Sequence, residues 1–334
     1  MTELTMTLSA VEDLCLKTLV AAGASMDNAR SVARSTMLAE RDGIRSHGLL
    51  YVPIYADHLR CGKVDGKAVP AVNRPRPGAV TVDAATGFAH PAIDQGWPVL
   101  IDAARTNGIA AMTVFNSYNC GVLGHHAERI AEAGLLGLCT THAPASIAPP
   151  NGRSPVIGTN PFALGVPDGA GGAAIILDQS ASVIAKSEIL LRSREGRQIE
   201  PGWAINPQGK PTLDAAEALK GSMLPAGGHK GFGAGLLVEI LASCLSGAVL
   251  SKDASPFSGT AGGPPKTGQC FIAFDPAAFS SGFSQQIETL VAAIAEQEGA
   301  RLPGTGRRHA RAITEIEGIR VDGALIGRIE AFIR

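Results

Sequence analysis

The chain is organised around the stretch Arg41-Asp42-Gly43-Ile44-Arg45-Ser46-His47-Gly48-Leu49-Leu50. Imidazole titrates near neutral pH, so His47 is able to give or take a proton there. The glycine beside it lets a substrate approach the backbone closely. Asp42-Gly43 ends the preceding predicted helix, and the triplet Ser46-His47-Gly48 stands at the mouth of the next one. This position favours a proton-transfer site, although a lone histidine is more often structural.

Composition excludes several classes of function. The 334 residues are 45% hydrophobic, enough for a sizeable core in one large or two smaller domains. A net charge of −1 provides no basic field for nucleic acid or an anionic membrane. We expect no signal peptide and no membrane-spanning segment. The six cysteines lack any Cys-x-x-Cys pair, which predicts reduced thiols in the cytoplasm rather than disulfides or a zinc site.

The pattern of apolar residues predicts a mixed α/β fold, because strands and helices alternate along the middle of the chain. The first helix is expected to begin with a capping box at Ser9, and Gly23 to end it. A polar, proline-bearing connector is expected over 61–78, and a basic loop over 303–309. The remaining helices are expected at 25–41, 49–59, 91–106, between the loop 116–121 and Ala133, at 231–250 and at 284–299. The strands are expected at 79–83, 109–115, 135–141, 173–177, 270–274 and 318–321.

An ordinary dinucleotide-binding Rossmann domain is not expected. The glycines of Gly231-Phe232-Gly233-Ala234-Gly235 have the wrong spacing, and they follow His229-Lys230 rather than a strand. Two other segments suit phosphate: the glycine-rich run 227–233, and 303–309 with its arginines Arg307 and Arg308. The run 227–233 is equally well explained as a glycine-rich turn with a solvated lysine, whereas an exposed basic loop is the preferred interpretation of 303–309.

Two further candidates are weaker. The short polar groups of Gly158-Thr159-Asn160-Pro161 suit a substrate carboxylate, but turn chemistry explains them as well. His125 and His126 are adjacent on a predicted helix, so their side chains point about 100° apart and one ion rarely takes both. We therefore expect no metal.

Taken together and in order, the motifs resemble the malate/L-lactate dehydrogenase type 2 family, also called the sulfolactate dehydrogenase-like family. This family is unrelated to the Rossmann lactate dehydrogenases, and the similarity covers nearly the whole chain. The motifs that carry the resemblance are Asp42-Gly43, Ser46-His47-Gly48, Pro53, Tyr55, Gly158-Thr159-Asn160-Pro161, Leu177-Asp178, Pro201-Gly202-Trp203-Ala204, Gly209-Lys210-Pro211-Thr212, Gly228-His229-Lys230-Gly231-Phe232-Gly233 and Pro303-Gly304.

The resemblance implies a non-Rossmann fold with a largely antiparallel nucleotide-binding sheet and a homodimer. It implies three parts: an N-terminal helical module (1–62), a substrate and dimer domain (63–118 with 300–334) and an NAD(P)H-binding domain (119–299). The residues that it assigns to the cofactor are Asn119, Cys120, Gly121, Val122, Leu123, Asp178, Gln179, Ser180, His229, Lys230, Gly304, Thr305, Gly306, Arg307, Arg308 and His309. Arg307 and Arg308 favour NADPH over NADH, because a 2′-phosphate gives them a dianion to bind.

This sequence departs from the hydroxyacid dehydrogenase branch of the family at two positions. Asn119 occupies the position at which the members of that branch resemble one another by carrying a catalytic histidine. A base for alcohol oxidation is therefore missing here. Tyr51 stands where many members carry the arginine that anchors the substrate carboxylate. Arg45 or Thr159 is the expected substitute for that anchor.

The departures favour the ketimine reductase branch, whose members reduce Δ1-pyrroline-2-carboxylate and Δ1-piperideine-2-carboxylate to L-proline and L-pipecolate. An imine needs a hydride at carbon and one acid at nitrogen. We assign the acid to His47, its orientation to Ser46, and the acidic member of the relay to Glu188, which the resemblance places after the Asp178 strand. The alternatives are a 2-hydroxyacid dehydrogenase acting on malate, lactate, sulfolactate or ureidoglycolate, and a silent relative that only binds nucleotide.

Overall fold

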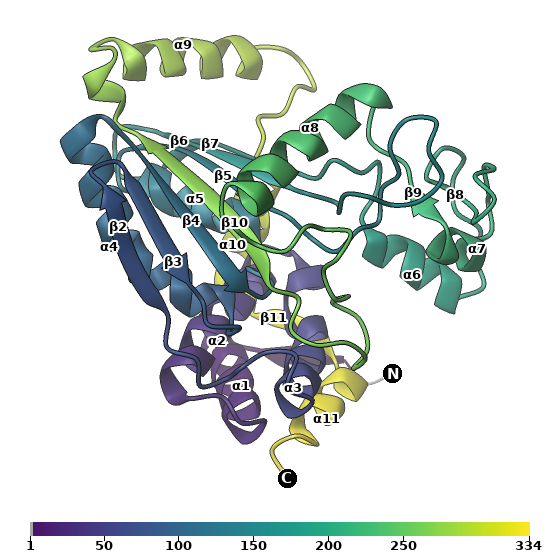
Figure 1. The fold of residues 1–334 in the computed structure, drawn as a ribbon. Coiled ribbons are helices and arrows are strands. Elements are labelled where there is room, and N and C mark those ends of the chain that lie inside the picture. Colours follow the sequence, from purple (N-terminus) through teal and green to yellow (C-terminus); the bar gives the residue numbers. More distant parts are fainter. Residues whose placement is uncertain (1–2) are drawn as a thin grey trace.

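The computed structural model describes residues 3–334, and a seven-stranded sheet runs through its centre (Figure 1). Only β3 and β4 are parallel, and every other neighbouring pair is antiparallel. The expected non-Rossmann, largely antiparallel sheet is therefore confirmed. In spatial order the strands are β2 (Ala71–Arg76), β3 (Ala79–Asp83), β4 (Ile109–Ser117), β10 (Thr267–Phe274), β5 (Leu136–Thr141), β6 (Phe162–Pro167) and β7 (Ala173–Gln179).

Two helices, α4 (Ala89–Asn107) and α5 (Leu123–Glu132), cover one face of this sheet and share its main apolar core. Glycines allow α5 to lie very close to the strands. A Cβ at Gly165 of β6 would lie 2.0 Å from the Ala127 carbonyl oxygen, and one at Gly137 of β5 would lie 2.6 Å from the Ile130 Cβ. The position of α5 is thus fixed by backbone contact, and α5 carries several residues of the site described below.

A second layer lies on the other face. Helix α8 (His229–Glu239) continues into a π-helical turn, η3 (Ile240–Cys244), and both lie in front of the sheet in Figure 1. A Cβ at Gly268 of β10 would lie 2.1 Å from the Ala242 carbonyl oxygen, so η3 touches the strand. The predicted helix over 231–250 therefore ends earlier than expected, because Gly247 adopts the left-handed conformation with φ +78°.

The two ends of the chain pack together. Helices α1 (Leu8–Ala21), α2 (Met26–Arg41) and α3 (Val52–Arg60) meet α11 (Gly323–Glu330), and β1 (Glu3–Met6) pairs with β11 (Ile319–Asp322). Their shared core includes Val11, Cys15 and Ile329. The C-terminal elements thus lie against the N-terminal helices. Strands from both sides of residue 118, the expected boundary between two parts of the chain, belong to the same central sheet. The three-part functional division stays a prediction.

A small lobe projects at the right of Figure 1 and comes from the middle of the chain. It contains α6 (Lys186–Arg194), α7 (Ala215–Lys220), β8 (Ala204–Ile205) and β9 (Ser222–Met223). Its own apolar cluster includes Ile147, Ile189 and Met223.

Some sequence predictions were wrong in detail. The basic segment is not a loop, since α10 (Thr305–Glu317) begins directly after Gly304, whose φ of +92° suits the turn into the helix. The first helix is capped by Thr7 rather than Ser9. Strand β2 lies within the expected connector, and β6 was not predicted. The helix expected at 284–299 is α9 (Phe283–Ala295). In the part of the chain that the structure describes, no helix is both long and apolar enough to cross a membrane.

Candidate active site

The triplet Ser46-His47-Gly48 forms a tight turn that the side chain of Glu40 supports. Arg45–His47 is a 3₁₀ turn just beyond the C-terminus of α2. The buried Glu40 Oε1 accepts a hydrogen bond from the Leu49 backbone N–H at 2.7 Å. A Cβ at Gly48 would lie 2.1 Å from that oxygen, so only glycine fits. Burial raises the pKa of Glu40, against the opposing Leu49 hydrogen bond. Sequence reasoning missed Glu40; its position four residues after the buried Thr36 was the available signal.

Four predicted site residues come together at this turn. The Ser46 Oγ lies 3.0 Å from the His47 Nδ1, which leaves the other ring nitrogen free to face a ligand. The Tyr51 ring stacks on His47 with 6.4 Å between ring centroids and 5° between planes. Burial raises the pKa of Tyr51 to about 12, against a hydrogen bond with Asn119. The Asn119 Oδ1 accepts from the Tyr55 hydroxyl at 3.2 Å. The substitutions that set this chain apart, Tyr51 and Asn119, are therefore direct neighbours beside His47.

A polar cradle lies near this turn, at the N-terminus of α5. The Asp178 Oδ2 accepts from the Gly124 backbone N–H at 2.9 Å and from Arg307 Nη2 at 2.5 Å. The other terminal nitrogen of Arg307 is buried and has no partner among the described residues. A Cβ at Gly124 would lie 2.1 Å from that nitrogen. A free guanidinium N–H beside a helix N-terminus and a glycine suits an anionic cofactor group.

The two arginines expected to share one phosphate point to different places. Arg307 reaches Asp178, near the end of β7, whereas Arg308 Nη1 donates to the Ala173 carbonyl at 3.3 Å, at the start of that strand. Five residues of extended strand span about 16 Å. One phosphate group therefore does not meet both side chains in this arrangement.

Asp42 holds together the elements that surround the cradle. In the sequence it was noted only as a residue that ends a helix and belongs to a family motif. Its side chain is fully buried and accepts from His125 Nε2 at 3.1 Å, Arg311 Nη2 at 2.8 Å and Arg41 Nε at 2.8 Å. Burial acts to raise the pKa of Asp42, but these three donors outweigh it and hold the pKa well below its usual range. Arg311 also binds Glu128 at 3.0 Å. The network joins α2, α5 and α10.

Several other predicted residues lie apart from the turn. Glu188 is in the first turn of α6, in the small lobe, and accepts from Arg192 at 3.0 Å. His229 and Lys230 are exposed at the start of α8. Across residues 3–334, no hydrogen bond or ion pair joins any of these three to Ser46 or His47.

The rest of the predicted cofactor residues differ in accessibility. Cys120, Val122 and Leu123 are buried, so contacts from them would come mainly from backbone, and burial raises the pKa of Cys120 to about 12 against a hydrogen bond with Thr141. Those with at least part of the residue accessible are Gly121, Gln179, Ser180, Gly304, Thr305, Gly306 and His309, and the predicted substrate residue Thr159 is partly accessible as well.

Charges around His47 decide its protonation. Burial lowers the pKa of His47; Asp178 opposes this, while His125 and Arg307 lower it further. In the cofactor-free protein we expect His47 to titrate below its ordinary value of about 6.5, so that its charged, proton-donating form is lost as pH rises through this lowered pKa. Ring-proton NMR titration measures this value. Asp178→Asn should lower the pKa further, and Asp27→Asn, which removes an exposed charge outside the site, should not. A pKa for His47 above that of an exposed histidine would contradict this electrostatic account.

Comparison with known proteins bears on what this site does. A family model described as malate/L-lactate dehydrogenase matches residues 6–330. The chain is 41% identical to a Δ1-pyrroline-2-carboxylate reductase of Ancylobacter novellus, covering 98% of this chain and 96% of that protein. It is 39% identical to the (2R)-3-sulfolactate dehydrogenase (NADP(+)) of Chromohalobacter salexigens, covering 96% of each.

A solved structure agrees with the sequence relatives. The fold matches the Δ1-piperideine-2-carboxylate reductase of Pseudomonas syringae pvar. tomato with a TM-score of 0.92 and 35% identity, over 98% of this chain and 99% of that one. The resemblance drawn from the motifs is confirmed. The chain is an oxidoreductase that belongs to the malate/L-lactate dehydrogenase family.

Proposed function

We propose that this enzyme uses NADPH to reduce Δ1-pyrroline-2-carboxylate and Δ1-piperideine-2-carboxylate to L-proline and L-pipecolate. The observation that carries the proposal is the single acid of the site. His47 is paired with Ser46, and Asn119, which bonds to Tyr55, has an amide where the resemblance to the hydroxyacid branch implies a second titratable group. Imine reduction needs only one proton donor, and alcohol oxidation needs a base. Named relatives at 41% and 35% identity act on these two imines.

The residues of the turn divide the work. The bound nicotinamide supplies the hydride that the C=N carbon receives. His47 donates a proton from its free ring nitrogen to the imine nitrogen, and Ser46, 3.0 Å from Nδ1, holds the ring in orientation. The Tyr51 ring lies parallel to the imidazole, beside the position proposed for the substrate. Glu188 is our candidate for the acidic member of the relay on the basis of the resemblance.

Arg45 is our first choice for the substrate carboxylate. It adjoins Ser46 and His47, it is exposed, and across residues 3–334 it forms no ion pair. An arginine free of a protein carboxylate is suited to a planar, bidentate carboxylate. Thr159 and Tyr51 would then contribute hydroxyl groups.

The cofactor residues proposed above fit an extended dinucleotide. The unpartnered N–H of Arg307 and the α5 N-terminus suit a phosphate, Asp178 suits ribose hydroxyl groups, and Arg308 is exposed for a 2′-phosphate. NADPH is therefore our first choice and NADH the second. The NADP-dependent sulfolactate relative keeps a 2-hydroxyacid dehydrogenase as the second candidate function.

The reaction is tested by NADPH oxidation at 340 nm with Δ1-pyrroline-2-carboxylate, with pyruvate and oxaloacetate as 2-keto acid controls. We expect turnover of the imine, and His47→Ala should lower kcat by about 10²–10⁴-fold because the proton donor is lost. Glu188→Gln should lower kcat with little change in KM if it serves the relay. Turnover of keto acids without turnover of the imine would reject the reductase and establish the dehydrogenase.

The cofactor preference is tested on Arg308 alone. Arg308→Ala should raise the KM for NADPH by about 10–100-fold, the equivalent of one charge-assisted contact, and leave the KM for NADH within about twofold. Arg301→Ala, which removes an exposed arginine from the preceding segment, is the control. Arg307→Ala should weaken both coenzymes, because Arg307 also holds Asp178. Equal losses with both coenzymes in Arg308→Ala would remove it from the 2′-phosphate site.

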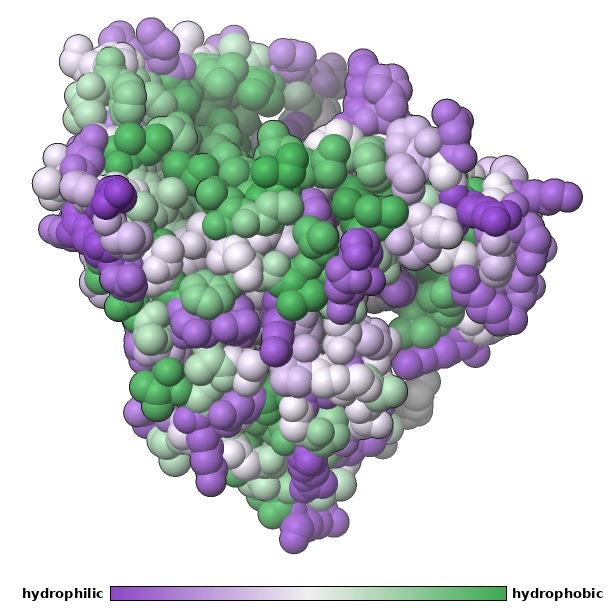
Figure 2. Space-filling view, in the orientation of Figure 1, coloured by the Kyte–Doolittle hydropathy of each residue, from purple (hydrophilic) through white to green (hydrophobic). Residues whose placement is uncertain are grey.

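We also propose that the protein forms a homodimer. For its location we propose a reducing compartment such as the cytoplasm, because the six cysteines are free. Apolar side chains gather across the upper part of the face in Figure 2, where α8 lies. Leu236, Leu237 and Ile240 are 43–53% exposed there, and Leu290 of α9 is 50% exposed. Such a patch is typical of an interface.

Light scattering should therefore give twice the 34.3 kDa of the chain. Leu237→Glu should shift the mass toward one chain, because a charge would enter the apolar contact. Leu213→Glu changes an equally accessible leucine outside this patch and should leave the mass unchanged. A monomeric wild-type protein would refute the dimer, as would a Leu237→Glu variant that keeps the double mass.

A further inference from the structure

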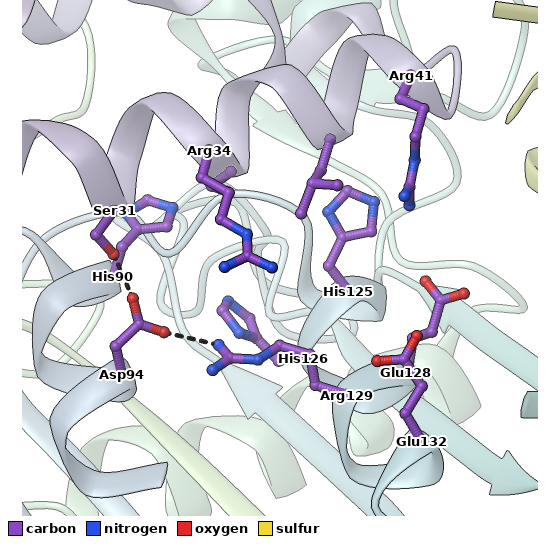
Figure 3. A pocket seen from close by; sticks show the side chains of 12 residues that line it. Ser31, Arg34, Arg41, His90, Asp94, His125, His126, Glu128, Arg129 and Glu132 are labelled. Atoms are coloured by element: carbon purple, nitrogen blue, oxygen red, sulfur yellow. Dashed lines mark hydrogen bonds and ion pairs between the residues drawn. The ribbon is translucent and has the colours of Figure 1, made fainter. Parts of the chain in front are cut away.

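A cleft separate from the His47 turn lies between α2, α4 and α5. Its volume is about 270 Å³, and polar side chains line most of it (Figure 3). Arg34 enters from α2, His90 and Asp94 from α4, and His126 and Arg129 from α5. None of these five residues belongs to the catalytic or cofactor machinery proposed above.

Buried polar atoms in this cleft lack partners. His90 is 4% exposed, and both of its ring nitrogens are without a hydrogen bond among residues 3–334. His126 is 5% exposed; its Nε2 lies 2.9 Å from the Cys120 carbonyl oxygen, but its Nδ1 is also without a partner. Buried polar groups are normally hydrogen-bonded, so unpaired imidazole nitrogens beside a cavity indicate a missing ligand.

The charges of the cleft indicate the sign of that ligand. Asp94 is fully engaged, accepting from Ser31 at 2.5 Å and from Arg129 at 2.9 Å, and Arg129 also lies over the Trp97 ring at 4.3 Å. Arg34 forms no ion pair in the described chain. Figure 3 shows its guanidinium directed toward that of Arg129, with His126 beside them. At this end of the cleft, Arg34 and Arg129 therefore face the single carboxylate of Asp94, while Arg41, Glu128 and Glu132 line the rest of the cleft.

We propose that this cleft is a second binding site, for a small carboxylate anion held between Arg34 and Arg129, with a His90 N–H as a further donor. The His126 Nε2 donates to the Cys120 carbonyl, so the His126 Nδ1 becomes a donor to the anion only when the ring is protonated. A carboxylate carries the single negative charge that the arginines lack, and its two oxygens suit guanidinium groups. Inorganic phosphate offers the same oxygen chemistry with more charge.

The site touches the loop proposed for the cofactor. A Cβ at Gly121 would lie 2.8 Å from the Ser35 Oγ and 2.9 Å from the His90 Nε2. The His126 Nε2 forms a hydrogen bond with the carbonyl oxygen of Cys120, the residue before Gly121. An anion that fixes His90 and His126 therefore fixes the loop as well. This coupling rests on the proposed cofactor role of residues 119–123, whereas the binding itself does not.

Binding should be linked to protons. Burial lowers the pKa of His90 to about 4 and that of His126 to about 3. An anion beside them raises both values, so affinity should increase as pH falls. The charged and titratable groups that face these rings are Arg34 and Arg41 from α2, Asp94 from α4, His125, Glu128, Arg129 and Glu132 from α5, and His47 from its turn.

The test is a histidine ring NMR titration of the cofactor-free protein with acetate, with inorganic phosphate, and with chloride at the same ionic strength. We expect saturable shifts of the His90 and His126 signals with acetate, and tighter binding at about pH 5.5 than at about pH 7.5. Arg34→Gln should weaken acetate at least tenfold. Arg30→Gln, which changes the same residue type on the same helix but pairs with Asp27 outside the cleft, should not.

The outcomes separate the claims. Equal acetate binding in Arg34→Gln and Arg30→Gln, or shifts no larger than with chloride, would overturn the site. Phosphate binding without acetate binding would overturn the assignment to a carboxylate. A Kd for NADPH that changes with acetate in the wild type and not in Arg34→Gln would establish the coupling, because linkage between two sites is reciprocal. These binding readouts stand even if the enzyme reduces no imine.

Discussion

The buried carboxylate of Asp42 is the constraint on which the site depends. It accepts hydrogen bonds from Arg41, His125 and Arg311, which belong to three different helices. A buried carboxylate without donors costs several kcal/mol, about 3–5 when one partner of a buried pair is removed. The three helices are therefore held in one relative position. Through α10 this position also sets Arg307 against the α5 N-terminus.

Close backbone contact complements this ionic anchor. Gly165 and Gly137 bring α5 against the sheet, so the cofactor cradle at its N-terminus is built on a rigid element. Gly48 does the same for the His47 turn, since Glu40 occupies the space of a side chain. Glycines thus serve the site by closeness of approach rather than by a phosphate-loop motif.

The two adjacent histidines of α5 connect this helix to two different networks. His125 turns to Asp42, while His126 turns to the Cys120 carbonyl and the cleft between the helices. Adjacent helical histidines point about 100° apart, which is why they serve different networks rather than one metal. Among residues 3–334, no cluster of three or more His, Cys, Asp or Glu side chains suits a metal ion.

The sequence by itself determined the elements and the family. The periods of apolar residues predicted most of the long helices and five of the seven central strands, but they missed β2, β6 and α10. The ordered motifs predicted the family and brought Ser46, His47 and Asn119 to attention. Only the tertiary structure decided which charges meet. Arg307 and Arg308 are neighbours in sequence but reach opposite ends of β7, and Arg311 meets Asp42 from the far end of the chain. Local pattern follows from backbone geometry within a few residues, whereas ion pairs join groups more than a hundred residues apart, and their distances depend on how the helices pack.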